Sequence, residues 1–269
     1  MTDTNNSGES DVLVIGDSCM DIFTYGLAER LCPDVPAPVL KPLRRVKGMG
    51  MAGNLFKNLE SLGVKCDICT NPTKTSKERF IDLETNHTFL RVDREDDIPR
   101  VTKQWLEGYD LSQYKAIAVA DYGKGFLEDE DIQYLCENNE NVFLDTKKQL
   151  GDFCAKARCI KINLPEYVEI VKDLTLEDWK DKLIVTQGKR GATFYTGCED
   201  NNGWEKFEAE SVEVYDVTGA GDTFHAGLIM RYLNSNDLRS SITYANACAA
   251  KVVQQRGVSV PEPDEAQEA

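Results

Sequence analysis

Histidine is scarce in this chain, and long apolar runs are missing. Among 269 residues there are 2 histidines, His87 and His225, and the 9 cysteines include one pair at CxxC spacing, Cys66 and Cys69. Because a structural zinc site needs about four Cys or His ligands at matched spacings, zinc binding is not expected. No run reaches the roughly 18 apolar residues that cross a bilayer, so no membrane-spanning helix is expected either.

Positive charge is also in short supply. The chain has 31 basic and 46 acidic residues and a net charge of −15. This balance disfavours nucleic acid or an anionic membrane as the main partner, but it permits a phosphate ligand in a locally basic pocket. The odd number of cysteines indicates no disulfide framework and fits a reducing cytoplasm. Residues 1–10 are polar and lack a signal-peptide core, and with the acidic residues 261–269 they are expected to form flexible ends.

Short apolar runs typical of buried parallel strands recur along the chain. They lie at residues 12–15, 116–120, 142–144, 159–162 and 183–186. Helical patterns lie between or after them, at residues 129–137, 165–172, 223–233 and 237–254. This alternation predicts an α/β fold with a mainly parallel central sheet flanked by helices. The length fits a single domain over residues 11–260.

Two charged segments interrupt the alternation. Residues 36–47 and 77–93 are rich in β-branched or alternating residues, which suits strands with one covered face. We expect both segments to form a small β-flap that projects from the main sheet as a lid.

The most informative segment is the run from residue 215 to 224. Gly219 and Gly221 permit a tight turn, and helix formers follow them, so the glycines lie where a helix begins. The free amides at a helix N-terminus attract anions. The neighbouring Asp222 would repel a phosphate, but it can take a proton from a hydroxyl that attacks one. The segment therefore predicts phosphoryl transfer to an alcohol.

Polar residues follow the other predicted strands. Asp17 and Asp21 come directly after the first strand, and Asp21 could accept hydrogen bonds from a polyol or form a local turn or cap. Asn163 is suited to cap the helix that Pro165 starts. Glu166 could reach a magnesium ion through water, although a helix cap alone would also account for this segment.

Glycine-rich segments leave more than one interpretation open. Residues 48–53 match GxGxxG, but they do not follow the first strand, so a substrate-contacting turn that includes Asn54 is favoured over a dinucleotide site. Residues 186–191 suit the wall of a nucleotide site or a plain hairpin. Lys147 ends a strand and either offsets phosphate charge or is solvated. The Walker phosphate loop and the protein-kinase triplets are absent.

Taken together, these motifs resemble the ribokinase-like, PfkB-type sugar kinases. Within that family the chain most resembles the kinase half of the bifunctional ADP-heptose synthases, which supply lipopolysaccharide precursors. The resemblance covers about residues 11–260 and rests on residues 16–26, 30–39, 121–125, 145–147, 163–166 and 216–223. It implies a ribokinase-like fold and the transfer of phosphate from ATP, with Mg²⁺, to C1 of a heptose 7-phosphate.

The resemblance also implies roles for individual residues. The amides of Gly219, Ala220 and Gly221 would form the anion hole beside Asp222. The sugar phosphate would be bound by Asp21, Gly50, Asn54 and Lys124, with Lys77 and Arg79 near its distal phosphate. ATP would be bound by Asn163, Thr186, Gly188, Gly191, Asn246 and Lys147. Glu166 would hold Mg²⁺ through water, and Asp216 and Thr218 lie where relatives bind a monovalent cation such as K⁺.

One departure from the family pattern keeps the substrate open. Met51 replaces a glycine at which the family's backbone normally approaches the substrate. A different sugar or a nucleoside therefore remains an alternative acceptor, and a catalytically weak sugar- or nucleotide-binding homologue is a further alternative. The resemblance also implies a cytoplasmic homodimer that forms through the β-flap.

Overall fold

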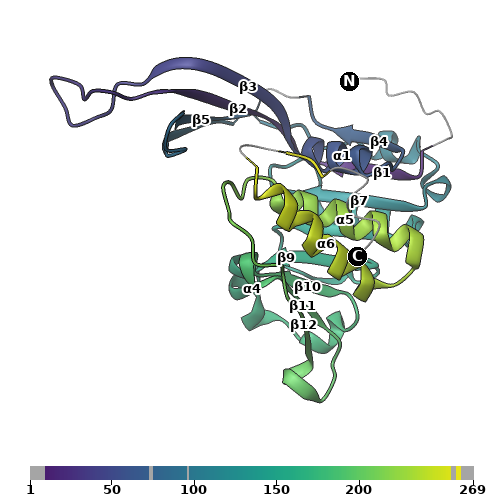
Figure 1. Cartoon of the computed structure of the whole chain (residues 1–269). Helices are drawn as coiled ribbons and strands as arrows, with labels where there is room; N and C mark the ends of the chain where they lie inside the picture. Colours follow the sequence, from purple (N-terminus) through teal and green to yellow (C-terminus); the bar gives the residue numbers. More distant parts are fainter. Residues whose placement is uncertain (1–9, 73–74, 96, 256–258, 262–269) are drawn as a thin grey trace.

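An eight-stranded sheet forms the centre of the molecule (Figure 1). The computed structural model describes residues 10–72, 75–95, 97–255 and 259–261. The predicted apolar runs form β1 (Val12–Gly16), β7 (Ala116–Asp121), β8 (Val142–Thr146), β9 (Cys159–Asn163) and β10 (Leu183–Thr186). These strands are parallel to one another and to the edge strand β4 (Cys66–Thr70). At the other edge, β11 (Ala192–Tyr195) and β12 (Trp204–Phe207) pair antiparallel.

Helices cover both faces of this sheet. Alternate residues of β1 point to opposite faces, so Val12 and Val14 belong to one apolar core and Leu13 and Ile15 to another. The first core contains α1 (Ala52–Ser61), α5 (Ala220–Ser235) and α6 (Leu238–Val252). The second contains α2 (Lys103–Glu107), α3 (Asp129–Asn138) and α4 (Leu164–Ile170). Burial on both faces explains why these strands read as continuous apolar runs, and the predicted α/β fold class is confirmed.

Short 3-10 turns complete the main domain. They lie at Leu111–Gln113, Asp152–Cys154, Val171–Asp173, Leu176–Trp179, Gly188–Arg190 and Asp200–Gly203. No helix in the described part of the chain is both long and apolar enough to cross a bilayer. Apart from Ser10 and Pro261, the segments expected to be flexible ends, 1–10 and 261–269, lie outside the described residues.

A second sheet of four strands projects from the domain as a flap (Figure 1). Its order is β3 (Lys41–Met51), β2 (Ser18–Leu27), β5 (Ser76–Asp82) and β6 (Thr88–Arg94). The expected segment 36–47 begins too early, because β3 starts at Lys41 and continues to Met51. The strand β2 was not predicted. Its sequence mixes polar and apolar residues on both faces, so it lacks the alternation that marks a half-buried strand.

Candidate active site

The first turn of α5 lies against the carboxyl end of the main sheet. Gly219 has a φ of 83°, a left-handed conformation that favours glycine, and α5 begins at the next residue. The N–H of Ala220 donates to the carbonyl of Val217 at 3.2 Å. Within the described residues no acceptor faces the amides of Gly219 and Gly221. These two amides remain available to an anion, whereas the Ala220 amide is used within the turn.

Asp222 is buried at the start of α5, with 7% of its surface exposed. Asn54 Nδ2 on α1 donates to its Oδ2 at 2.8 Å, and the hydroxyl of Tyr122 donates to its Oδ1 at 2.5 Å. Burial raises the pKa of Asp222 to about 6, although the bonds from Asn54 and Tyr122 and the nearby Lys161 oppose the rise. The carboxyl group is therefore mostly ionised at neutral pH, as a general base must be.

A buried ion pair lies beneath the same turn. The ammonium of Lys161 on β9 pairs with the carboxylate of Asp145 on β8. A Cβ atom placed on Gly221 would lie 3.5 Å from Lys161 Nζ, so this cation lies close to the free amides. Burial acts to lower the pKa of Lys161, but the adjacent Asp145 outweighs it, so the net effect is a raised pKa. Lys161 keeps its charge. Lys161 was not predicted as a site residue, although a lysine within an otherwise apolar run is a signal that the sequence shows.

The flap brings a second acidic group to the site. Asp21 on β2 is buried and pairs with Arg79 on β5 at 3.2 Å. Gly50 lies against it, because a Cβ atom at Gly50 would come within 2.2 Å of an Asp21 carboxylate oxygen. Met51, with a φ of 59°, holds the left-handed conformation that favours glycine at the entry to α1. The pairing of β2 with β3 thus brings Asp21 beside Gly50, and Asn54 follows in the first turn of α1.

Replacing Gly50 with alanine is expected to weaken acceptor binding. The added methyl group would displace the Asp21 carboxylate from its position beside Arg79. Since one charge-assisted contact would be lost, we expect KM for the acceptor to rise about tenfold with little change in kcat. The control is Gly151→Ala, because a Cβ atom there would make only ordinary contacts of 3.8 and 3.9 Å with the Phe153 ring, outside the site. Equal steady-state constants for the two variants would contradict the role assigned to Asp21.

A cavity of about 630 Å³ extends from Asn54 beneath the flap. Its described lining residues are Phe23, Tyr25, Arg44, Val46, Lys47, Gly48, Met49, Asn54, Lys57, Leu83, Gln255, Ser259 and Val260. No carboxylate occurs among them. Within the described residues, no ion pair joins Arg44, Lys47 or Lys57 to an acid, whereas Arg45 and Arg94 pair with Glu78. The cavity is therefore locally positive in a strongly acidic protein.

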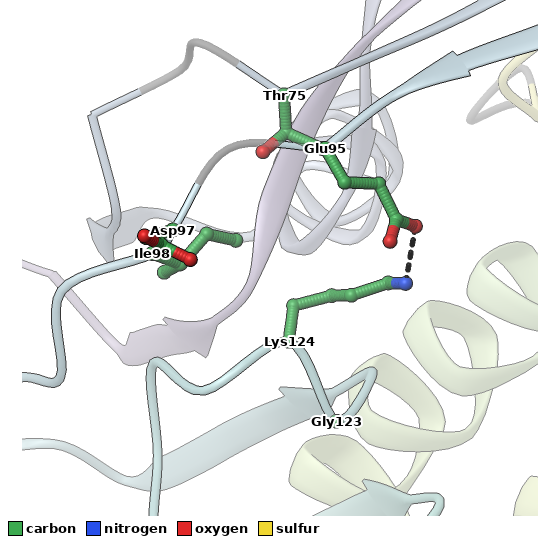
Figure 2. Close-up of a pocket in the computed structure, with 6 residues that line it drawn as sticks. All are labelled: Thr75, Glu95, Asp97, Ile98, Gly123 and Lys124. Atoms are coloured by element: carbon green, nitrogen blue, oxygen red, sulfur yellow. Dashed lines mark hydrogen bonds and ion pairs between the residues drawn. The ribbon is translucent and has the colours of Figure 1, made fainter.

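The remaining predicted acceptor ligands have other contacts. The Lys77 ammonium lies 5.6 Å from the centre of the Tyr122 ring. Arg79 lies over the ring of Phe23 at 5.3 Å in addition to its pairing with Asp21. Lys124 pairs with Glu95 and lines a separate cavity of about 370 Å³ (Figure 2). In this structure the Lys124 ammonium therefore already has a carboxylate partner.

The predicted nucleotide residues lie mostly at the ends of the neighbouring strands. Asn163 and Glu166 form a reciprocal capping box at the start of α4, with bonds of 2.9 and 2.8 Å. Thr186 ends β10, and Gly188 and Gly191 lie in the turn that leads to β11. Other predicted residues contact protein groups. Gly191 closely approaches the carbonyl of Phe207, which accepts a 3.0 Å hydrogen bond from Asn246. The Lys147 ammonium lies 5.3 Å from the centre of the Tyr122 ring.

The predicted cation ligands form no preassembled metal cage. Asp216 accepts a 2.9 Å bond from the N–H of Thr218, so its carboxylate holds a local turn. In the part of the chain that the structure describes, no three His, Cys, Asp or Glu residues are grouped as metal ligands. Cys66 and Cys69 both belong to β4.

A buried carboxylate, two free amides at a helix N-terminus and a buried lysine lie together in this part of the α/β fold, an arrangement that suits phosphoryl transfer. The chain belongs to the pfkB family of carbohydrate kinases, whose model matches residues 48–265. It is therefore a kinase of this family, that is, a phosphotransferase.

Similar proteins include the bifunctional protein HldE of Cronobacter sakazakii, which is 28% identical over 302 aligned positions. That match covers 96% of this chain and 63% of the relative, so the chain spans less than two thirds of the relative's length. Among solved structures, the ribokinase of Thermotoga maritima has a TM-score of 0.70 at 16% identity, over 96% and 98% of the two chains. The Arabidopsis thaliana ribokinase complexed with ribose and ATP has a TM-score of 0.66 at 13% identity, over 94% and 96%. These structures share the fold.

Proposed function

We propose that the chain is an ATP-dependent kinase that phosphorylates the C1 hydroxyl of heptose 7-phosphate or of a closely related sugar phosphate. The observation that carries this proposal is the placement of the Asp222 carboxylate. It lies between the free amides of α5 and a cavity whose cations have no acidic partner among the described residues. One side of Asp222 suits a transferred phosphoryl group, and the other suits an acceptor that is itself anionic.

The transfer needs one proton acceptor and several positive groups. Asp222 takes the proton of the acceptor hydroxyl as its oxygen bonds to the γ-phosphorus of ATP. The bond between that phosphorus and the bridging oxygen breaks, and ADP leaves with the electron pair. The amides of Gly219 and Gly221 and the ammonium of Lys161 stabilise the charge on the transferring group, which is the main task of the protein in such reactions.

Mg²⁺ would supply further positive charge to the phosphates when bound. Magnesium usually keeps several waters and takes one or two protein carboxylates besides the substrate phosphates. Glu166 fits this need, because only one of its oxygens caps Asn163. Its influence on Lys161 also indicates that it lies near the buried ion pair. A K⁺ ion at Asp216 and Thr218 stays a prediction.

The cavity beneath the flap suits the distal phosphate of the acceptor. Arg44 lies over the Tyr25 ring at 5.9 Å, and neither Arg44 nor Lys57 has a carboxylate partner within the described residues. Arg79 is less suited to this role, because Asp21 already neutralises it. We therefore place the distal phosphate near Arg44 and Lys57, farther along the flap than Lys77 and Arg79.

An acceptor panel tests the proposal. The purified chain would be given ATP, Mg²⁺ and either heptose 7-phosphate, the free heptose, ribose or a nucleoside, and ADP release would be measured. We expect the highest kcat/KM with the phosphorylated heptose. The double variant Arg44→Gln with Lys57→Gln should raise KM for that acceptor at least tenfold and leave kcat nearly unchanged. The control is Arg45→Gln, which alters the neighbouring residue that pairs with Glu78.

Other outcomes of the panel would favour the alternatives. Preference for a nucleoside would agree with the apolar rings of Phe23 and Tyr25 in the cavity, on which a base can stack. Tight binding of ATP or sugar without ADP release would favour a binding homologue. Homodimerisation through the flap and a cytoplasmic location stay predictions.

A further inference from the structure

Tyr122 contacts the general base, yet no step of the proposed transfer uses it. Its hydroxyl lies 2.5 Å from Oδ1 of Asp222, while Asn54 occupies Oδ2. The distance is at the short end for a bond from a hydroxyl to a carboxylate, and bonds to charged acceptors are the stronger kind. The two donors together hold both oxygens of the carboxylate.

The backbone of Tyr122 is fixed to the main sheet. Asp17, which follows β1 and is 1% exposed, accepts from the N–H of Tyr122 at 2.8 Å. The same carboxylate accepts from the N–H groups of Lys124 at 3.3 Å and Phe126 at 3.2 Å. One buried side chain thus holds three amides of the loop after β7. The phenol ring therefore has a defined position relative to α5.

Two cations flank the phenol ring of Tyr122, and the hydroxyl of that ring acts as a hydrogen-bond donor. Lys77 of the flap and Lys147 after β8 lie 5.6 and 5.3 Å from the ring centre. Such cation–ring contacts stabilise the position of both partners. Burial, together with the nearby Asp222, raises the pKa of Tyr122 well above its ordinary value. The hydroxyl therefore keeps its proton and can donate to Asp222 without exchanging a proton with it.

We propose that Tyr122 is a positioning residue for the general base: its hydroxyl orients the Asp222 carboxylate and stabilises the ionised form that accepts the acceptor's proton. This inference rests on the proposed function only where it names Asp222 as the base. Other groups also act on that carboxylate, namely Asn54 on α1, Cys19 on β2, Asp145 on β8 and Lys161 on β9. They stay unchanged in the variants below, so a difference between variants isolates the hydroxyl of Tyr122.

The kinetic test is the pH profile of Tyr122→Phe. We expect the acid limb of kcat/KM to move upward by about one pH unit, because the ionised base loses a charge-assisted hydrogen bond. The value of kcat/KM near pH 6 should fall about fivefold and should recover as the pH rises above about 8. The matched control is Tyr114→Phe. This substitution deletes a hydroxyl that donates to Asp67 at 2.7 Å. Tyr114 lies just before β7, at the opposite end of the sheet from Asp222, so the pH profile should stay unchanged.

A second measurement needs no substrate. The free energy of unfolding is compared between the parent and Asp222→Asn over a range of pH. Because the pKa of Asp222 is raised to about 6, the parent should lose stability relative to that variant as the pH rises through about 6. In the Tyr122→Phe background the loss should still begin near pH 4, which the unfolded state sets, but its upper end should move up by about one pH unit, so the total loss becomes larger.

The outcomes separate the two proposals. The positioning role is supported if Tyr122→Phe moves both the acid limb of kcat/KM and the upper end of the stability loss to higher pH, and Tyr114→Phe moves neither. A loss of turnover that is equal at every pH, with the unfolding window unmoved, would mean that Tyr122 only packs and would overturn the inference. If the parent phosphorylates no acceptor, the proposed function falls, and the unfolding comparison still decides the role of Tyr122.

Discussion

Asp222→Asn is expected to lower turnover by about 10² to 10⁴-fold, the range that a general base commonly contributes. Binding of ATP should change little, because the variant keeps the helix turn and the free amides of Gly219 and Gly221. The asparagine can still accept from Asn54 and donate to the oxygen of Tyr122, so the local packing is preserved. ADP release and nucleotide titration calorimetry measure the two properties separately.

The same substitution should stabilise the fold at neutral pH. Burial raises the pKa of Asp222 to about 6, whereas its pKa in the unfolded state is near 3.8. Ionising this carboxyl group therefore costs more free energy in the folded state than in the unfolded state. The resulting penalty is absent below about pH 4, grows as the pH rises, and reaches about 3 kcal/mol above pH 6. Urea unfolding at both ends of this window should show the gain only at the higher pH.

A suitable control for turnover is Asp67→Asn. Asp67 also accepts from two side chains, Tyr114 and Ser10, but it lies at the other end of the sheet. Full turnover in Asp222→Asn would reject the assignment of the base. Equal losses in the two variants would indicate a general effect on folding.

Lys161→Met is expected to be the most destabilising single substitution in the site. It would leave the carboxylate of Asp145 partly buried without its cation, and breaking one partner of a buried pair costs about 3 to 5 kcal/mol. Turnover should also fall, because the lost ammonium lies beneath the turn that would hold the transferred phosphoryl group. Chemical denaturation and ADP release measure the two effects.

A double variant separates stability from catalysis. Combining Lys161→Met with Asp145→Leu replaces the buried pair with apolar groups, a change that is often neutral or stabilising. We expect the free energy of unfolding to recover, while turnover stays low because no cation is restored. Recovery of both would show that Lys161 serves only the fold.

The sequence predicted the main sheet well, because its strands are buried on both faces and read as unbroken apolar runs. It also placed the start of α5 and the cap of α4, since Gly219 and Asn163 act through their immediate neighbours. It missed β2, a flap strand with polar contacts on both faces: Asp21 pairs with Arg79, and Thr24 bonds to Glu78. Alternation of polar and apolar residues cannot reveal a strand when both of its faces contact polar groups.

The contacts within the site were harder to predict. Asn54 and Asp222 are 168 positions apart, and only the packing of α1 beside α5 brings them together. Tyr122 lies in the matched segment 121–125, but the resemblance gave it no role, and Lys161 belongs to no matched segment. The importance of both follows from the residues that surround them. The pairing of Lys124 with Glu95 likewise depends on how the flap returns to the main domain. Such contacts depend on tertiary structure.

The four strands of the flap come from two separate stretches of chain, with α1 and β4 between them. The parallel pairing of β2 with β5 joins these stretches, and Thr24 bonds to Glu78 across it at 3.0 Å. For protein engineering, this means that the lid cannot be transplanted as one cassette. Moving its acceptor preference to another scaffold would require two coordinated insertions, and a shift of one residue in either would turn Asp21 to the wrong face.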